Sequence, residues 1–334
     1  MARLYAGVAP WTRDTRCVLV RCGGVAWHCG KRVAGTEERI AGAPPVPPVQ
    51  TPAGCMHEAD RLNPPGSSGT MPAVPLFDGY IFDLDGTIYL GDAALPGAVA
   101  TVAALRGAGR RVVFISNNPS RPSAVYARRL TELGIPADPA DVVNSTDVLV
   151  QWLLAHQPGC RVFVVGEQPL RDALHSAGFQ LSEQAGAIDV VIASFDRTFA
   201  YPKLQIAFDA IRAGARFVAT NADRYCPVPG GGQPDAAAVI AAIEACTATR
   251  VEVVVGKPSP IMVATIASRL QLPPAGCLVV GDRLETDIAM GNQAGMASTL
   301  VLTGATARAD LADQPIQPTY VLEHIAQLLP AHLV

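Results

Sequence analysis

The sequence lacks three features that would assign it to a large class of proteins. It has no uninterrupted apolar run of 18 or more residues, so we expect no membrane span. Its 26 Lys and Arg stand against 29 Asp and Glu, for a formal net charge of −3. This balance argues against nucleic acid as the main partner, because a phosphate backbone selects for clustered positive charge. Neither the G-x-x-x-x-G-K-S/T loop of P-loop kinases nor the G-x-G-x-x-G dinucleotide fingerprint occurs.

A disulfide framework is also missing from the main body of the chain. The eight cysteines stand at positions 17, 22, 29, 55, 160, 226, 246 and 277, without a set of short, even spacings. This distribution favours a reducing cytoplasm over a secreted scaffold. Arginines at positions 3, 13, 16 and 21 interrupt the apolar residues near the N-terminus, so a secretory signal is not expected. The sequence thus predicts a cytoplasmic protein.

The N-terminal segment, up to position 76, differs in composition from the rest of the chain. Residues 43–54 and 63–70 are dense in Pro and Gly, and such segments bury too little apolar surface to offset their ordering entropy. We expect residues 1–76 to be a mostly disordered leader, and Met71 would suit a natural start. Six Cys and His residues, at 17, 22, 28, 29, 55 and 57, lack the tight cysteine pairs of a zinc site, so zinc binding is not favoured there.

From residue 78 onward, short apolar runs alternate with helical segments. Runs typical of buried strands lie at 80–82, 111–115, 161–165, 189–193, 216–219, 251–255 and 277–280. Helical stretches are expected at 96–108, 122–133, 168–177, 203–213, 235–247 and 259–270. This alternation predicts an α/β fold with a doubly wound parallel sheet, covered by helices on both faces.

Two acids follow the first predicted strand, at the edge of the sheet where α/β proteins bind their ligands. Because side chains two apart on a strand share a face, Asp83 and Asp85 should project into the same crevice. Gly86 lets the chain turn sharply after them. Two carboxylates this close repel each other, and a hard cation such as Mg²⁺ relieves the repulsion. The alternative is a turn in which Asp and Gly simply end a strand.

Three other strand ends carry groups that suit a phosphate and a metal. Ser116 and Asn117 offer a hydroxyl, an amide and backbone N–H groups, and Lys257 offers a positive charge. Asp282, with Asp287 five residues later, suits metal ligation. Each signal alone also fits a plain turn, a helix start or an N-cap. Their placement at separate strand ends favours one shared site.

Together these residues resemble the four motifs of the haloacid dehalogenase superfamily. The matching segments are Asp83-Leu-Asp-Gly-Thr87, Ser116-Asn117, Lys257 and Gly281-Asp-x₄-Asp287. The resemblance covers residues 78–330 and implies a Rossmann-like catalytic core. Acids at the first and third positions of the first motif make it similar to the phosphatases and phosphomutases of the superfamily.

Motif spacing indicates where a second domain is inserted. Only 33 positions separate Asp83 from Ser116, whereas 141 separate Ser116 from Lys257, and the longer interval resembles the type II cap group. We therefore expect a catalytic core of residues 77–157 and 251–334 with an inserted α/β cap domain of residues 158–250. The phrase Thr220-Asn-Ala-Asp223, among others, resembles the NagD and 4-nitrophenyl phosphatase branch, although Ala222 stands where many relatives carry Pro.

The resemblance implies a mechanism. Asp83 would attack phosphorus and form an aspartyl-phosphate, and Asp85 would act as general acid and then as general base. Mg²⁺ would be held by the Asp83 carboxylate, the Asp85 backbone carbonyl and Asp282. Asp287 would lie behind these ligands and orient Lys257.

The resemblance also implies how a substrate is bound. Ser116, Asn117 and Lys257 would hold the transferring phosphate. The cap would exclude water and select the leaving group, and the segment 227–232 would form a loop near the site. The candidate substrate-binding residues of the cap are Asp196, Asn221, Asp223, Arg224 and Tyr225.

We expect the substrate to be a small phosphorylated metabolite, such as a sugar phosphate or a nucleotide. Similar proteins commonly form homodimers through the cap, which the resemblance extends to this chain. Two alternatives remain. A signalling receiver domain also uses acids and a Lys on a doubly wound sheet, but it is far shorter and needs no second acid two places after the first. A catalytically silent relative that binds a metal or a phosphorylated metabolite would keep the same motifs.

Overall fold

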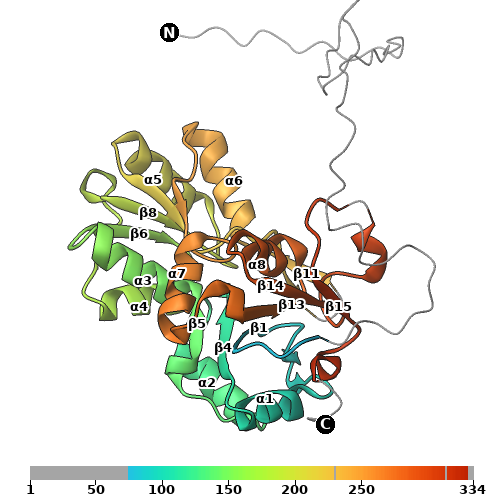
Figure 1. Cartoon of the computed structure of the whole chain (residues 1–334). Helices are drawn as coiled ribbons and strands as arrows, with labels where there is room; N and C mark the ends of the chain where they lie inside the picture. Colours follow the sequence, from blue (N-terminus) through green and yellow to red (C-terminus); the bar gives the residue numbers. More distant parts are fainter. Residues whose placement is uncertain (1–73, 229–230, 313, 330–334) are drawn as a thin grey trace, which may run out of the picture. The chain divides into compact units, whose positions relative to one another are not determined.

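The computed structural model describes residues 74–228, 231–312 and 314–329. The predicted leader, as far as residue 73, lies outside these residues, together with its Cys and His positions. Within the described residues, helices cover two parallel β-sheets (Figure 1), which confirms the α/β class. No helix in this part of the chain is long and apolar enough to cross a membrane.

Six parallel strands form the first sheet, in the order β15-β14-β13-β1-β4-β5. They are β1 (Gly79–Asp83), β4 (Arg111–Ser116), β5 (Val142–Asn144), β13 (Cys277–Gly281), β14 (Ala297–Val301) and β15 (Tyr320–Leu322). All five residues of β1 are buried, and the strand lies between β4 and β13. The sequence pattern does not predict β5, β14 and β15, whose runs are short or include polar residues.

Each face of the first sheet is covered by its own helices. The helices are α1 (Ala98–Gly107), α2 (Ser123–Glu132), α3 (Ser145–His156), α7 (Pro260–Leu270) and α8 (Ala289–Gln293). Since successive residues of a strand point to opposite faces, Tyr80 and Phe82 pack in one buried cluster with α1 and α2. Ile81 packs in another cluster with α3, α7 and α8. The doubly wound arrangement is thereby confirmed, although α3 was outside the predicted helices.

The second sheet has five parallel strands in the order β12-β9-β8-β6-β7. They are β6 (Arg161–Val165), β7 (Gln180–Leu181), β8 (Val190–Ala193), β9 (Arg216–Ala219) and β12 (Val253–Val254), and their helices are α4 (Gln168–Ser176), α5 (Tyr201–Arg212) and α6 (Ala236–Thr247). One face packs on α5 and α6. The other belongs to the same buried cluster as Ile81, so one apolar core is continuous between the two sheets.

The strand expected at 251–255 differs from its prediction. Only Val253 and Val254 form β12, and they pair with Val218 and Ala219 of β9. This strand therefore belongs to the second sheet, although the predicted core segment begins at residue 251. The chain returns to the first sheet only after β12, through Lys257 and α7.

Two short hairpins complete the described elements. β2 (Tyr89–Leu90) pairs with β3 (Ala93–Ala94). β10 (Tyr225–Val228) pairs with β11 (Gly231–Pro234), where the sequence indicated a loop at 227–232. The reason is that both strands of a two-stranded ribbon are edge strands, and edge strands accept the Pro and Gly residues that a central strand would not. Short helical turns lie at Pro139–Asp141, Ala185–Ala187, Pro274–Gly276, Leu284–Ile288, Arg308–Leu311 and Ile325–Leu328.

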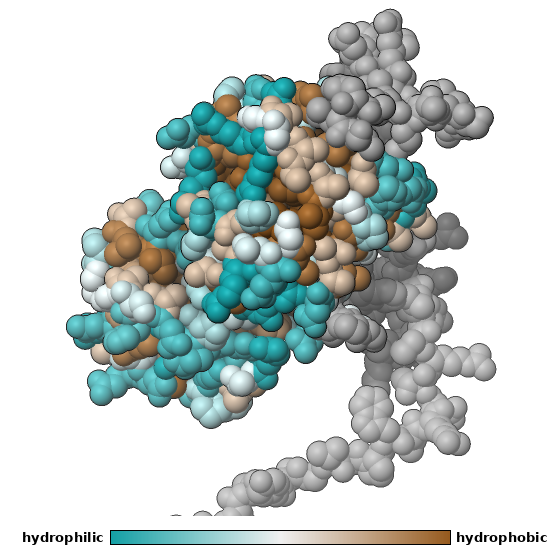
Figure 2. Space-filling view, turned by 90° about the horizontal axis from the view of Figure 1, so that it is seen from below, coloured by the Kyte–Doolittle hydropathy of each residue, from teal (hydrophilic) through white to brown (hydrophobic). Residues whose placement is uncertain are grey.

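Hydrophobic surface is divided into separate patches among hydrophilic residues on the face that Figure 2 shows. The exposed large hydrophobic side chains of the described residues are Leu90, Leu154, Phe199, Tyr201 and Tyr225. Two of them, Leu90 and Tyr225, lie in the two hairpins. Both hairpins border the cavities described next.

Candidate active site

Three strand ends of the first sheet meet the start of α7 at one small cavity. Asp83 ends β1, Ser116 ends β4, Asp282 directly follows β13, and Lys257 precedes α7. The cavity has a volume of about 60 Å³, and its wall includes most of the predicted residues: Asp83, Asp85, Ser116, Asn117, Asp223, Tyr225, Lys257, Asp282 and Asp287. Asn221, which was also expected to bind substrate, is absent from this wall.

Lys257 is buried between two carboxylates. Its Nζ lies 2.5 Å from Asp83 Oδ1 and 2.7 Å from Asp287 Oδ1. Burial alone would lower the pKa of Lys257, but the carboxylates of Asp287 and Asp83 outweigh it and raise that pKa above its ordinary value. The ammonium therefore stays charged, and it is held against the end of β1.

Asp282 brings a third buried carboxylate close to the two that contact this ammonium. Carboxylate oxygens of Asp83, Asp282 and Asp287 lie within 4.8 Å of one another. Burial, with the charge of Asp287, raises the pKa of Asp282 to about 6. Burial likewise raises the pKa of Asp83 well above its ordinary value, against the opposing charge of Lys257. Three carboxylates against one ammonium leave excess negative charge in a poorly solvated place, and an all-oxygen donor set of this kind suits a hard cation.

Gly86 allows the acids to approach so closely. Its φ is +85°, in the left-handed region that residues with a side chain rarely adopt. A Cβ atom at this position would come within 2.5 Å of Asp282 Oδ2. The turn after Asp85 therefore depends on glycine both for its backbone and for the space beside Asp282.

Asp85 lines the small cavity but is not part of the three-acid cluster. Burial raises the pKa of Asp85, and the positive charges of Arg129, Lys257 and Arg121 oppose that shift. Its side chain also lines a second cavity, of about 450 Å³. Asp85 thus stands in the wall between the two spaces.

The side chain of Asn117 is bonded through both of its polar atoms. Its Oδ1 accepts from the Lys257 N–H at 2.8 Å. Its Nδ2 donates to the Lys257 carbonyl at 3.2 Å and to Asp223 Oδ2 at 2.8 Å. Asp223 lies after β9 in the second sheet, so one amide group ties the end of β4 to both Lys257 and that segment.

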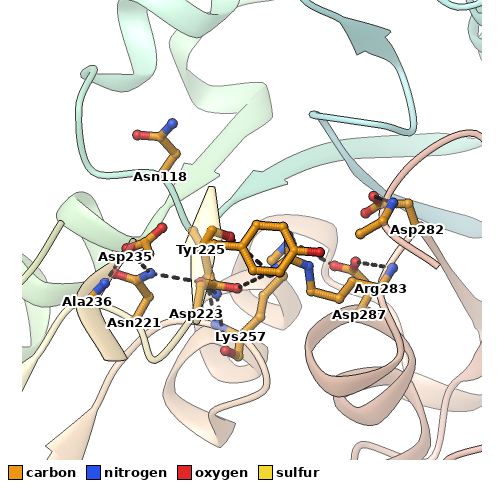
Figure 3. Close-up of polar contacts among 12 residues, drawn as sticks. Asn118, Asn221, Asp223, Tyr225, Asp235, Ala236, Lys257, Asp282, Arg283 and Asp287 are labelled. Atoms are coloured by element: carbon orange, nitrogen blue, oxygen red, sulfur yellow. Dashed lines mark hydrogen bonds and ion pairs between the residues drawn. The ribbon is translucent and has the colours of Figure 1, made fainter. Parts of the chain in front are cut away.

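Asn221 supports Asp223 and does not face the cavity. The residue is fully buried. Its Nδ2 donates to Asp223 Oδ2 at 2.8 Å and to Asp235 Oδ1 at 3.1 Å (Figure 3). Its Oδ1 accepts from the Thr220 hydroxyl at 2.7 Å. Every polar atom of this side chain therefore has a protein partner.

The other predicted cap residues are spread over different positions. The Asp196 carboxylate has no exposed surface and accepts from Lys203 Nζ at 2.6 Å, so it stabilises its own loop. Arg224 lines a third cavity, of about 430 Å³. Tyr225 lines both this cavity and the small one, and its ring centre lies 5.2 Å from the guanidinium of Arg283.

Arg283 is a site residue that the sequence analysis misses. Its guanidinium lies 3.4 Å from Asp223 Oδ1, and its backbone N–H donates to Asp287 Oδ2 at 3.2 Å (Figure 3). Arg283 thus connects the segment of Asp282 and Asp287 to Asp223, and Asn117 connects the end of β4 to the same residue. The signal of Arg283 in the sequence is only its place next to Asp282, at a motif position where any residue is allowed.

Asp235 is the second residue missed. It lines the small cavity, and its side chain caps α6 by accepting from the Ala236 N–H at 2.5 Å. Burial raises the pKa of Asp235 to about 6. An Asp directly before an apolar helix is a recognisable N-cap signal. The sequence therefore indicates that Asp235 starts a helix, but not that it lines the cavity.

Comparison with known proteins gives matches to two family models and to curated relatives. Residues 80–180 match the family model described as haloacid dehalogenase-like hydrolase, and residues 254–328 match a second model, described as HAD-hydrolase-like. The sugar-phosphatase AraL of Bacillus subtilis (strain 168) is 38% identical over 247 residues, which cover 74% of this chain and 90% of that protein. The chain belongs to the haloacid dehalogenase-like hydrolase family.

Solved structures of related proteins share the fold. The 4-nitrophenylphosphatase of Thermotoga maritima matches with a TM-score of 0.72 at 34% identity, over 75% of this chain and 96% of that one. The glycerol phosphate phosphatase of Mycobacterium tuberculosis, solved in complex with magnesium, matches with a TM-score of 0.68 at 34% identity, over 75% of this chain and 76% of that one. The family and the fold predicted from the motifs are confirmed.

Proposed function

We propose that this chain is a magnesium-dependent phosphatase that hydrolyses small phosphate monoesters through a covalent intermediate on Asp83. The observation that carries the proposal is the buried contact of Asp83 with Lys257, in a cavity whose wall also contains Asp85. The related proteins support it, because their names state activity on sugar, 4-nitrophenyl and glycerol phosphates. The proposed substrate is a small phosphorylated metabolite, such as a sugar phosphate or a nucleotide.

The proposed reaction has two steps. An oxygen of Asp83 attacks phosphorus as the bond to the alcohol breaks, and the proton of Asp85 passes to the leaving oxygen. Asp85 then takes a proton from water, whose oxygen attacks the aspartyl-phosphate, releases inorganic phosphate and restores Asp83. The Lys257 ammonium, the Ser116 hydroxyl and the backbone N–H of Asn117 would bind the transferring group, where fixed donors stabilise the charge that develops.

The acidic cluster fits Mg²⁺. The carboxylates of Asp83 and Asp282 and the backbone carbonyl of Asp85 would hold the ion, and Asp287 would lie behind them, where it orients Lys257. When bound, the ion supplies positive charge that offsets the buried acids and the phosphate. The magnesium in the Mycobacterium tuberculosis relative supports this assignment.

We also propose that residues 77–157 and 251–334 form the catalytic core and residues 158–250 an inserted cap. The two large sheets support this division, although β12, of the core segment, pairs within the sheet of the proposed cap. The cap would exclude water from the cavity, and its exposed Phe199 and Tyr201 would suit a homodimer contact. Cys160 and Cys277 form no disulfide, which supports a cytoplasmic location.

Release of phosphate from 4-nitrophenyl phosphate tests both the activity and the metal. Excess EDTA should lower kcat by at least about 100-fold, because the ion supplies several kcal/mol of charge stabilisation, and added Mg²⁺ should restore it.

Asp282→Asn should raise the Mg²⁺ concentration for half-maximal rate at least about tenfold. The exposed Glu285, in the turn after Asp282, provides a control as Glu285→Gln, which should match wild type. Binding of Mg²⁺ without phosphate release would instead favour a silent binding protein.

Asp85→Asn should separate the two steps. With 4-nitrophenyl phosphate, whose leaving group needs little protonation, the variant should release a burst of about one nitrophenolate per site. Slow turnover, at least about 100-fold below wild type, should follow because no base activates water. Rapid-quench measurement would show both phases and the trapped phosphoprotein. A steady rate without a burst, equal to that of wild type, would contradict the role given to Asp85.

A further inference from the structure

A cavity of about 450 Å³ adjoins the small one through Asp85, Asn118 and Cys226, which line both. Its wall combines the β2–β3 hairpin, α2 with the segment before it, the loop after β8 and the β10–β11 hairpin. Apolar surface comes from Leu90, Tyr89 and Phe195. The charged residues in the same wall are Asp85, Asp92, Arg121, Arg129 and Arg197. Arginine side chains thus outnumber acids around a space large enough for a small organic group.

The position of Asp85 indicates which of the two neighbouring cavities would hold the leaving group. The small cavity also adjoins the 430 Å³ space that Arg224 lines, but Asp85 is not in that wall. A general acid must reach the oxygen that it protonates within hydrogen-bonding distance. An alcohol leaving from a phosphate in the small cavity therefore has to extend past Asp85, into the cavity that Leu90 and Phe195 line.

Two of the three arginines in this wall are paired. Arg197 donates to both oxygens of Glu167, at 2.6 and 2.7 Å. Arg129 lies 3.3 Å from Asp92 Oδ1 and over the ring of Tyr89. Each of these two arginines therefore has a carboxylate of the protein as a partner.

Arg121 differs from both. Its guanidinium makes no hydrogen bond or ion pair with any residue that the structure describes, and the residue is exposed at the cavity wall. Its charge acts on Tyr126 and, like that of Arg129, on Asp85. Arg121 directly precedes Pro122, the N-cap residue of α2, and lies five positions after Ser116. An unpaired cation in the wall of a partly apolar cavity is suited to an anion supplied by a ligand.

We propose that this cavity holds the leaving alcohol and that Arg121 binds a second anionic group on it, either a carboxylate or another phosphate. The inference rests on the proposed phosphatase function, and it narrows the substrates to phosphate monoesters with two anionic groups. Arg121 would act in binding and selection, with no part in breaking the phosphorus–oxygen bond. Neutral alcohols of the same size would fit the space but leave the guanidinium without a partner.

Matched esters provide the test. One pair is 3-phosphoglycerate and glycerol 3-phosphate, which differ by a carboxylate in place of a hydroxymethyl group. The other is 1,3-propanediol bisphosphate and 3-hydroxypropyl phosphate. For wild type, kcat/KM of at least one anionic ester should exceed that of its neutral partner tenfold or more, since a charge-assisted contact of Arg contributes about tenfold to a hundredfold. The pair that shows the preference identifies the anion as carboxylate or phosphate.

Variants assign that preference to one side chain. Arg121→Gln should lower the anionic-to-neutral ratio of kcat/KM at least tenfold, and Arg121→Lys, which keeps a cation, should lose less. Arg128→Gln removes the same charge from an exposed position of α2 outside the cavity and should leave the ratio unchanged.

The possible failures are distinguishable. A ratio near one in wild type, or a ratio unaffected by Arg121→Gln, overturns the inference while phosphatase activity stands. Equal losses in Arg121→Gln and Arg121→Lys would also overturn it, because they would assign the preference to shape and not to charge. If no ester is hydrolysed, 4-nitrophenyl phosphate included, the proposed function fails and the inference fails with it.

Discussion

Asp83→Asn should reduce phosphate release by at least about 10⁴-fold, because the amide is a poor nucleophile and no intermediate can form on it. The fold should survive this change. Asn has the shape of Asp, and the substitution removes one negative charge from the three-acid cluster while Lys257 keeps its contact with Asp287. In EDTA, the urea concentration at the midpoint of unfolding should therefore be no lower for the variant than for wild type.

The two measurements on Asp83→Asn have to be made together. Steady-state phosphate release gives the activity, and a urea titration followed by circular dichroism gives the stability. Asp209→Asn, an exposed acid on α5, is the matched control and should retain wild-type values in both. Full activity in Asp83→Asn would exclude Asp83 as the nucleophile. Lost activity together with lost folding would leave the nucleophile assignment unsupported.

Lys257→Met should lose both activity and stability. We expect kcat to fall by about 10²–10³-fold, as for other preorganised charges that face a developing anion. The free energy of unfolding in EDTA should fall by about 3–5 kcal/mol, since removing one partner of a buried ion pair leaves the other charges uncompensated. Met keeps the length and the apolar stem of Lys, so little of the loss would come from packing.

A surface ion pair provides the comparison for Lys257. Arg250 lies 2.6 Å from Glu244, a distance similar to those around Lys257, but its side chain is 88% exposed. Arg250→Met should therefore cost less than about 1 kcal/mol. Urea unfolding of both variants with the same buffer and EDTA measures the difference. Equal losses, or a Lys257→Met protein as stable as wild type, would show that the three-acid cluster does not depend on the ammonium.

That most of the candidate site residues line one cavity could be predicted from the sequence, because their places depend on position along strands. Asp83, Ser116 and Asp282 lie at the ends of parallel strands, and such ends meet at one edge of a sheet whatever the rest of the chain does. Lys257 also reaches this edge, but by a different route. It follows β12, which pairs with β9 in the second sheet. The local sequence does not show whether such a strand joins the first sheet or the second.

The residues between the two sheets could not be assigned in the same way. Asn221 was expected to bind substrate, and it is buried behind Asp223. Asn117, expected to hold phosphate, uses its side-chain amide on Lys257 and Asp223. A side-chain amide offers the same donors and acceptor to a ligand or to the protein, and only the packed structure shows which partner is nearer. Arg283 was missed for the related reason that its partner lies 60 positions away in the chain.

The central position of β1 has a consequence for biosynthesis. On one side Gly79 pairs with Arg111 of β4, the next long strand of the chain, and on the other it pairs with Cys277 of β13, far later in the sequence. A chain emerging from the ribosome therefore carries the strand of Asp83 with one edge open until most of the sequence has been made. Pairings this distant form slowly, and open strand edges favour aggregation. Nascent or C-terminally truncated chains should hence be the forms most dependent on chaperones.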